Sequence, residues 1–327
     1  MKLIISHFFN EEYLLPWWLK HHRVLFDHGV LIDYHSTDRS IEICRELVPN
    51  WEIISSENKN FSALACDFEV MKHEDRFPGA WKIALNTTEF LVGKHLDKII
   101  ERAETGNYLG ASIPGTAMVD DNPEVTLDLN VPLVAQKFHG FWESEFPLER
   151  VNFPWYFPRA RTRLLHRHRF GAYTPGRHSS MLTPLMDISK KELGIWWYGY
   201  SPWTAEFVAR KAQIQTKMDP LDKEVGRGLQ HLANDQEQQM RRKVLLDYAH
   251  DLTLPGEQAE RENYSKAQYL DAQHAAIAER DAAIAERDAA IAERDAAIAE
   301  REQAKRYPWK HFGNAYRMRS KKKLSDH

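Results

Sequence analysis

Residues 1–95 alternate between short apolar runs and stretches whose apolar residues recur at helical spacing. The opening run, residues 2–9, has the length of a buried strand, and the apolar positions within residues 13–22 recur as on one face of a helix. The same succession follows twice more, with strands predicted at 30–33, 51–54 and 83–85 and helices at 41–47 and 61–74. This regular alternation predicts an α/β domain, with a parallel sheet and helices on its faces.

The later patterning divides the chain into three parts. Residues 204–253 have a helical composition, and Pro255-Gly256 then marks a boundary. We therefore expect a folded domain over residues 1–255, an alanine-rich heptad-repeat helix over 256–304 and a basic, aromatic tail over 305–327.

A seven-residue unit, Asp-Ala-Ala-Ile-Ala-Glu-Arg, occurs three times after a variant that begins at His274. A sustained seven-residue period is typical of coiled coils. Charged residues lie three and four positions from Ile284, however, so the apolar stripe consists of alanine alone. This pattern predicts a long exposed helix, about 60 Å in length if residues 262–304 are all helical. A spacer and a surface for weak homo-oligomer formation are the two roles that fit it.

The tail interleaves basic residues with Tyr307, Trp309 and Phe312. This composition suits an anionic membrane surface, which attracts each nearby Lys or Arg by about 1 kcal/mol. Nucleic-acid binding and disorder are the alternatives that the same composition allows.

Composition narrows the class of protein. A net charge of −3 over 327 residues creates no global field that would attract nucleic acid. Cys44 and Cys66 lack metal-ligand spacing and fit buried thiols in a reducing cytoplasm. No apolar run approaches the ~18 residues of a membrane span, and the N-terminus lacks a signal-peptide layout. We expect a cytoplasmic protein, with peripheral attachment to the inner face of the plasma membrane as a further expectation.

Polar side chains follow the predicted strand at 83–85. Asn86, Thr87, Thr88 and Glu89 come directly after it, before the chain turns apolar again. Open α/β sheets bind ligands beyond the carboxyl ends of their strands. This segment is therefore a candidate ligand site.

Several motifs in this part of the chain resemble bacterial family-2-type glycosyltransferases. They are Asn10-Glu11-Glu12, Trp18-Leu19-x-His21-His22, Ile32-Asp33-x-x-Ser36-Thr37-Asp38 and, in register with them, residues 86–91. The resemblance covers about residues 1–95. It implies a GT-A-like, Rossmann-like mixed sheet with flanking helices, to which the repeat adds a long C-terminal helix. It also implies a transferase of the hexosyltransferase type that uses a nucleotide sugar.

In that family, residues 86–91 correspond to an Asp-x-Asp-Glu-Phe-Leu motif, whose carboxylates hold a divalent metal on the donor diphosphate. Here Asn86 and Thr88 stand in place of the two aspartates, and Glu89 remains. Hard cations favour carboxylate ligands. No cofactor is therefore certain, and Mn²⁺ or Mg²⁺ held by Glu89 with the donor phosphates is the alternative to metal-independent transfer.

A basic segment offers another source of positive charge. Arg159, Arg161 and Arg163 alternate, so in an extended chain they share one face. Arginine matches phosphate geometry with paired donors. We predict that Asn86, Thr88, Arg161, Arg163 and His178 contact the diphosphate, while a solvated basic strand and a structural histidine remain the alternatives.

The resemblance also implies a nucleotide-binding set. Asp33, at a predicted strand end, can accept from a base N–H or a ribose hydroxyl, and Asn10, Glu12 and Asp38 are placed beside it. Each has a structural alternative, because Asp and Asn residues at these positions also cap helices and turns.

The sequence gives weaker signals for the residues that would bind and activate the acceptor. Residues 138–157 are dense in aromatic side chains, which line sugar clefts or fill ordinary cores. Glu143 and Glu145 lie within this stretch, and either is a candidate general base for an acceptor hydroxyl. The acidic stretch 120–124 is interpreted as a solvated turn, with metal binding as the alternative.

Together with these patterns, the resemblance implies a glycosyltransferase that moves a sugar from a nucleotide donor to a cell-surface glycan or a lipid-linked acceptor. Two other classes stay open. One is a non-catalytic nucleotide- or sugar-binding protein that has lost its metal carboxylates. The other is a coiled-coil scaffold in which the repeat is the working part.

Overall fold

The computed structural model describes residues 1–93, 96–146, 161–224 and 233–253, together with residues 286, 289, 292–294 and 296. The chain divides into two compact units, Met1–Ala267 and Gln268–His327. In the second unit the described residues are helical and exposed. The remainder of the predicted repeat helix, the tail and Arg159 lie outside the described residues.

The elements of the first unit confirm the predicted alternation up to residue 85, with ends within two residues of the expected bounds. The strands are β1 (Lys2–Phe8), β2 (His28–Asp33), β3 (Glu52–Ser55), β4 (Trp81–Ala84), β5 (Glu89–Gly93), β6 (Gly110–Val119), β7 (His139–Trp142), β8 (Thr162–His166), β9 (Leu185–Asp187), β10 (Leu193–Tyr200) and β11 (His250–Asp251). The helices are α1 (Leu15–His22), α2 (Ser40–Leu47), α3 (Ala63–Glu74), α4 (Leu96–Thr105), α5 (Leu133–Gln136), η1 (Glu143–Glu145), α6 (Ala205–Gln213), η2 (Ile214–Lys217), α7 (Pro220–Glu224) and α8 (Asp235–Leu246).

The first four strands set the architecture. In the sheet they are neighbours in the order β3, β2, β1, β4, and all three pairs are parallel. The chain steps outward from β1 to β3 and then returns to the other side of β1 for β4. This reversal is a topological switch point, where open α/β sheets leave a crevice beyond the carboxyl ends of the strands.

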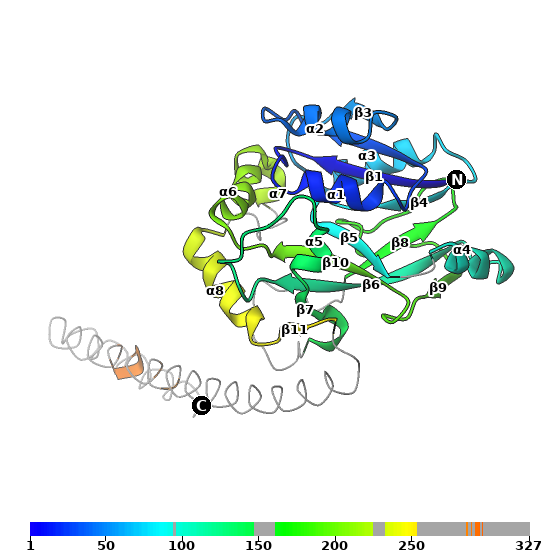
Figure 1. Cartoon of the computed structure of the whole chain (residues 1–327). Helices are drawn as coiled ribbons and strands as arrows, with labels where there is room; N and C mark the ends of the chain where they lie inside the picture. Colours follow the sequence, from blue (N-terminus) through cyan, green and yellow to red (C-terminus); the bar gives the residue numbers. More distant parts are fainter. Residues whose placement is uncertain are drawn as a thin grey trace, which may run out of the picture. The chain divides into compact units, whose positions relative to one another are not determined.

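Both faces of this sheet are covered. Successive side chains of a strand point to opposite faces, and those of β1 are apolar on both faces. Ile4 and Phe8 point into a core shared with Trp18 of α1. Leu3 and Ile5 point into a second core, shared with Val70 of α3. Figure 1 shows α1 and α3 flanking the blue strands.

The Trp-Leu-x-His-His stretch has a structural explanation. Trp18 Nε1 donates to the Glu89 carbonyl at 2.9 Å, and His21 Nε2 donates to the Leu91 carbonyl at 2.8 Å. His22 Nε2 accepts from the Leu91 N–H at 3.2 Å, while its Nδ1 donates to the Trp18 carbonyl. These side chains therefore attach α1 to the backbone of β5.

Antiparallel pairs join the second half of the sheet to the first. β8 lies between β4 and β6 and is antiparallel to both, whereas β6 and β10 are parallel. The described strands thus form a mixed sheet flanked by helices, and the predicted α/β class is confirmed. Within the described residues, none of the helices combines the length and the apolar character needed to span a bilayer.

Segments from the end of the first unit reach the carboxyl edge of β1 and β2. Arg210 of α6 pairs with Glu11, and Lys217 Nζ donates to the Tyr34 carbonyl at 2.7 Å. The Thr204 hydroxyl caps α6 by accepting from the Phe207 N–H. In Figure 1, α6 and α7 lie on the opposite side of the unit from the N-terminus, which marks the amino end of β1.

Candidate functional site

The carboxyl ends of β1, β2 and β4 form the edge at the switch point. Asn10 follows β1, Asp33 ends β2 and Asn86 follows β4. Three non-glycine residues of the loops at this edge adopt left-handed backbone conformations: Asn10 (φ 49°), His35 (φ 62°) and Arg177 (φ 59°). Such conformations cost about 1–3 kcal/mol each and persist only where the surrounding structure imposes them. The edge is therefore a constrained part of the fold.

The loops after β1 and β2 are bonded to each other. Asn10 Oδ1 accepts from the Thr37 N–H at 2.7 Å, and the Asn10 N–H donates to the Ser36 hydroxyl at 3.0 Å. The Glu12 N–H donates to Asp38 Oδ2 at 3.0 Å. Asn10, Glu12 and Asp38, which the resemblance placed in the nucleotide site, thus have structural partners that join the two loops.

Asp33 is differently placed. It is largely buried at the end of β2, and its Oδ1 accepts from the Ser36 N–H at 2.9 Å. Within the described part of the chain, its Oδ2 accepts no hydrogen bond. This oxygen is available to accept a hydrogen bond from a group beyond the end of β2.

A tight turn follows β4 and involves Glu89. The Asn86 N–H donates to Glu89 Oε2 at 2.9 Å, and the buried Arg163 donates from Nε to the same oxygen at 2.8 Å and from Nη2 to Oε1. Only 2% of the Glu89 surface is exposed. Burial alone would raise the pKa of Glu89, but Arg163 outweighs it and lowers the pKa. Glu89 is therefore a buried anion with an arginine partner.

These residues do not fit a divalent cation. Glu89 already neutralises Arg163, so a metal there would compete with the guanidinium, while Asn86 and Thr88 bring no charge. Among the described residues, no group of three or more His, Cys, Asp or Glu side chains could hold a metal ion.

Arg163 also binds the loop that follows β8. Its Nη1 donates to the Arg177 carbonyl at 2.7 Å, to the Gly176 carbonyl at 3.1 Å and to His178 Nδ1 at 2.9 Å. With Nε and Nη2 on Glu89, the guanidinium is surrounded by protein acceptors. Arg163 therefore holds this loop against the turn after β4, in a geometry different from the predicted diphosphate contact.

His178 lies at the rim of the same cluster. Although part of the His178 side chain is exposed, loss of hydration where its ring packs and the charges of Arg163, Arg161 and Arg177 lower its pKa. Its Nδ1 accepts from Arg163, which also requires that nitrogen to be unprotonated. His178 is therefore neutral at pH 7 and adds no positive charge.

Arg177 was not singled out from the sequence, yet its side chain contacts the turn after β4. Its Nη2 donates to Asn86 Oδ1 at 2.7 Å, and its Nη1 pairs with Asp67 of α3 at 2.6 Å. Gly176 N–H donates to the other Asp67 oxygen at 2.7 Å. The only sequence signal was the neighbouring glycine and histidine, which indicate a loop but not the direction of the Arg177 side chain.

The predicted base candidates lie on η1, which directly follows β7. Glu143 is buried and pairs with Arg161 at 2.8 Å, and the Arg161 guanidinium stacks 3.4 Å from the centroid of the Trp197 ring. Glu145 is exposed and pairs with Lys190. Both carboxylates are thus already engaged with cations, Glu143 with the residue that directly precedes β8.

The acidic stretch after β6 differs from the expected solvated turn. Asp120 is 1% exposed, pairs with the buried Lys137 at 2.7 Å and accepts from the Trp203 N–H at 2.7 Å. Asp120 is therefore a structural anchor for the segment before β7 and the segment before α6. The sequence suggested solvent because Asp121, Asn122 and Glu124 are polar, whereas long-range pairing with Lys137 determines the burial of Asp120.

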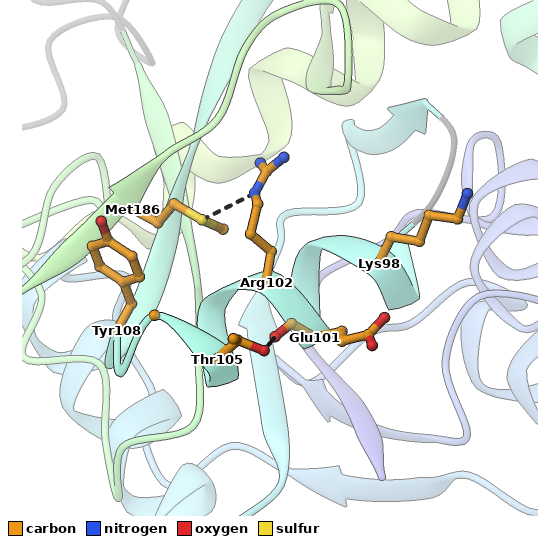
Figure 2. Close-up of a pocket in the computed structure, with 7 residues that line it drawn as sticks. Lys98, Glu101, Arg102, Thr105, Tyr108 and Met186 are labelled. Carbon is orange, nitrogen blue, oxygen red and sulfur yellow. Dashed lines mark hydrogen bonds between the residues drawn. The ribbon is translucent and has the colours of Figure 1, made fainter.

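A hollow of about 500 Å³ lies beside α4, lined by Lys98, Glu101, Arg102, Thr105, Gly106, Tyr108 and Met186. Figure 2 shows the Arg102 side chain reaching towards the Met186 sulfur. This hollow is at the amino end of β6, which runs in the same direction as β1. It therefore lies away from the carboxyl ends that form the switch-point edge.

No protein-family model matches the chain, and none of the curated proteins matches it. Solved structures that resemble it include S. aureus TarS 1-349, with 13% identity over 66% of this chain and a TM-score of 0.34. The complex of the same fragment with UDP-GlcNAc has 11% identity, 66% coverage of this chain and a TM-score of 0.37. The complex with UDP has 12% identity, 66% coverage of this chain and a TM-score of 0.35. The chain spans about two thirds of the length of these fragments, 65 to 66%, and the likeness is too slight to carry an argument.

Proposed function

We propose that this chain is a glycosyltransferase that binds a nucleotide-sugar donor at the carboxyl edge of β1, β2 and β4. The observation that carries the proposal is the switch point itself, because this is where open α/β sheets bind nucleotides. Asp33 and Asn86 lie at that edge, and the Arg177 guanidinium is bonded to Asn86. The motif resemblance over residues 1–95 independently supports a sugar nucleotide.

The free oxygen of Asp33 suits the nucleoside. A carboxylate at a strand end accepts from a base N–H or a ribose hydroxyl, and charged hydrogen bonds are stronger than neutral ones. The donor would then extend from β2 across β1 to β4, with its diphosphate beside Asn86.

We also propose that transfer is metal-independent. A leaving diphosphate needs its developing charge stabilised, and electrostatic stabilisation is usually the largest catalytic contribution. Because Glu89 is committed to Arg163, cationic side chains are better placed than a metal to provide it. Mn²⁺ or Mg²⁺ bound through the donor phosphates is the competing version.

A screen of nucleotide sugars tests the function, with sugar release as the readout in the presence of EDTA and in the presence of Mn²⁺ or Mg²⁺. We expect hydrolysis or transfer from one donor class, unchanged by EDTA. Activity that EDTA abolishes and manganese restores would refute the metal-free version. Binding without any turnover would favour the second candidate, a non-catalytic nucleotide-binding protein, which the loss of both motif aspartates specifically supports.

The acceptor remains within the same proposal. A cell-surface glycan or a lipid-linked precursor fits a transferase whose basic tail holds it at an anionic membrane. The general base would be a carboxylate near the acceptor, with Glu143 and Glu145 as the sequence candidates. Either would first have to leave its present cation, Arg161 or Lys190.

A further inference from the structure

The degenerate motif raises the question of which group meets the diphosphate charge. Four cationic or titratable side chains lie at the start of β8 or in the loop that follows it: Arg161, Arg163, Arg177 and His178. Their surroundings differ, and that difference decides among them.

Two of these side chains are already bound to protein partners, and a third is neutral. Arg163 is enclosed by Glu89 and three acceptors of the loop, and His178 is neutral. Arg161 pairs with Glu143 and stacks on Trp197. Each would have to give up strong contacts, or gain a proton, to bind a phosphate.

Arg177 differs in its remaining donors. One N–H of Nη1 is on Asp67 and one of Nη2 is on Asn86, and the guanidinium has five N–H groups in all. Its Nε is buried and has no hydrogen-bond partner among the described residues, although the side chain is only 6% exposed. Buried donors are nearly always bonded in folded proteins, so an unsatisfied one needs an explanation.

The surroundings fix this guanidinium in place. Asp67 is itself 2% exposed and binds both Arg177 Nη1 and the Gly176 N–H. Arg163 binds the Arg177 carbonyl, which holds the backbone at φ 59°. Burial alone would lower the pKa of Arg177, but Asp67 and Glu89 raise it, so the guanidinium stays charged. Asp67, Glu89 and Arg163 are thus positioning residues.

We infer that Arg177 takes the place of the missing metal, by binding the diphosphate of the nucleotide donor beside Asn86. This inference rests on the proposed function. In the transfer step the bond from the sugar anomeric carbon to the diphosphate oxygen breaks, and its electron pair stays on the diphosphate. An acceptor oxygen forms the new bond to that carbon, and its proton passes to a carboxylate base. Arg177 donates to the diphosphate oxygens as their charge grows.

The test measures how much the second phosphate adds to affinity when no metal is present. Uridine, UMP and UDP, and the corresponding guanosine series, are titrated by calorimetry in EDTA. We expect the parent protein to bind one diphosphate about 10-fold or more tightly than its monophosphate, as a charged hydrogen-bond pair predicts. In an Asp67→Asn/Arg177→Met double variant, which removes both buried charges together, this ratio falls towards one while monophosphate affinity is retained.

The matched control is an Asp75→Asn/Arg169→Met double variant. It removes an Asp–Arg pair of the same chemistry from an exposed site, and it should leave the ratio unchanged. If the first double variant loses its cooperative thermal melt, Arg177→Lys takes its place; it keeps the charge but loses the planar fork, and we expect a reduced ratio.

Two results would overturn the inference and leave the proposed function standing. One is an unchanged diphosphate preference in the Arg177 variants. The other is a preference that appears only with Mn²⁺ or Mg²⁺. Failure of the parent to bind any member of either series is a different outcome, because it removes the proposed nucleotide site itself.

Discussion

Two buried ion pairs secure the turn after β4 and the segments that pack around it. Glu89 with Arg163 and Asp67 with Arg177 each place one anion against one guanidinium, and all four side chains are buried. An isolated charge in such surroundings is strongly unfavourable, so each residue depends on its partner. Replacing one of these four residues should therefore lower the stability of the fold, whether or not that residue contacts a ligand.

Replacing Glu89 by Gln should destabilise the fold by about 3–5 kcal/mol, because it leaves Arg163 as an uncompensated buried cation. Urea unfolding measures this change. Glu192→Gln is the control, since it breaks a similar Arg pair at the surface, where such pairs contribute about 0–1 kcal/mol. Equal midpoints for the two variants would show that the buried pair contributes no more than the exposed one.

Asp33→Ala should weaken nucleotide binding without unfolding the domain. The lost charged hydrogen bond corresponds to about 1.5–3 kcal/mol, or roughly 10-fold or more in affinity. Titration with the nucleotide that the parent binds, beside a thermal melt, measures both quantities. Asp97→Asn, at an exposed carboxylate paired with Lys2, is the control, and unchanged affinity in Asp33→Ala would remove this residue from the site.

At the scale of elements, the local pattern of apolar residues was sufficient to predict those helices and strands that depend on neighbours in the sequence. The strands β1 to β4 and the helices α1 to α3 follow from apolar spacing, and the polar residues predicted after the strand at 83–85 do lie at the switch-point edge. The side chains that contact the residues at that edge could not be predicted in this way. Arg177 meets Asn86 from 91 residues away, and Asp120 meets Lys137 through the path of the chain after β6. Periodicity contains no information on such pairings.

The attachment of α3 should make stability depend on pH. Burial alone would raise the pKa of Glu69, but hydrogen bonds from His7, the Glu57 N–H and the Ser56 hydroxyl lower it to about 2. Because the folded pKa lies below the ordinary value of 4.5, the stabilisation is complete above about pH 4.5 and is lost as pH falls towards 2.

Glu69→Gln should therefore be less stable than the parent at pH 6, and the difference should shrink at pH 3. Chemical unfolding at the two pH values measures it. Glu46→Gln, at an exposed position of α2, should show no such change. A difference that stays constant across this window would contradict the assignment of the titrating group to Glu69.

At the scale of the whole molecule, we expect membrane affinity to reside in the basic tail rather than in the repeat. Deleting residues 305–327 should abolish co-sedimentation with anionic vesicles, and high salt should release the full chain, because screening weakens exposed charges. Neutral vesicles are the control for non-specific sedimentation. Equal binding by the truncated protein would assign the affinity to another part of the chain.

The contacts of the switch-point edge also bear on how the chain folds during synthesis. Glu11 is bonded to Arg210, 199 residues later, and the Tyr34 carbonyl is bonded to Lys217, 183 residues later. Chains fold from the N-terminus as they leave the ribosome, so β1 to β4 can pair while α6 and η2 are still unsynthesised. The loops after β1 and β2 are synthesised early, but they gain these contacts only after α6 and η2 have been made. A nascent chain would contain β1 to β4 well before the loops after β1 and β2 are held by their later partners, and premature termination before Arg210 would leave these loops without either contact.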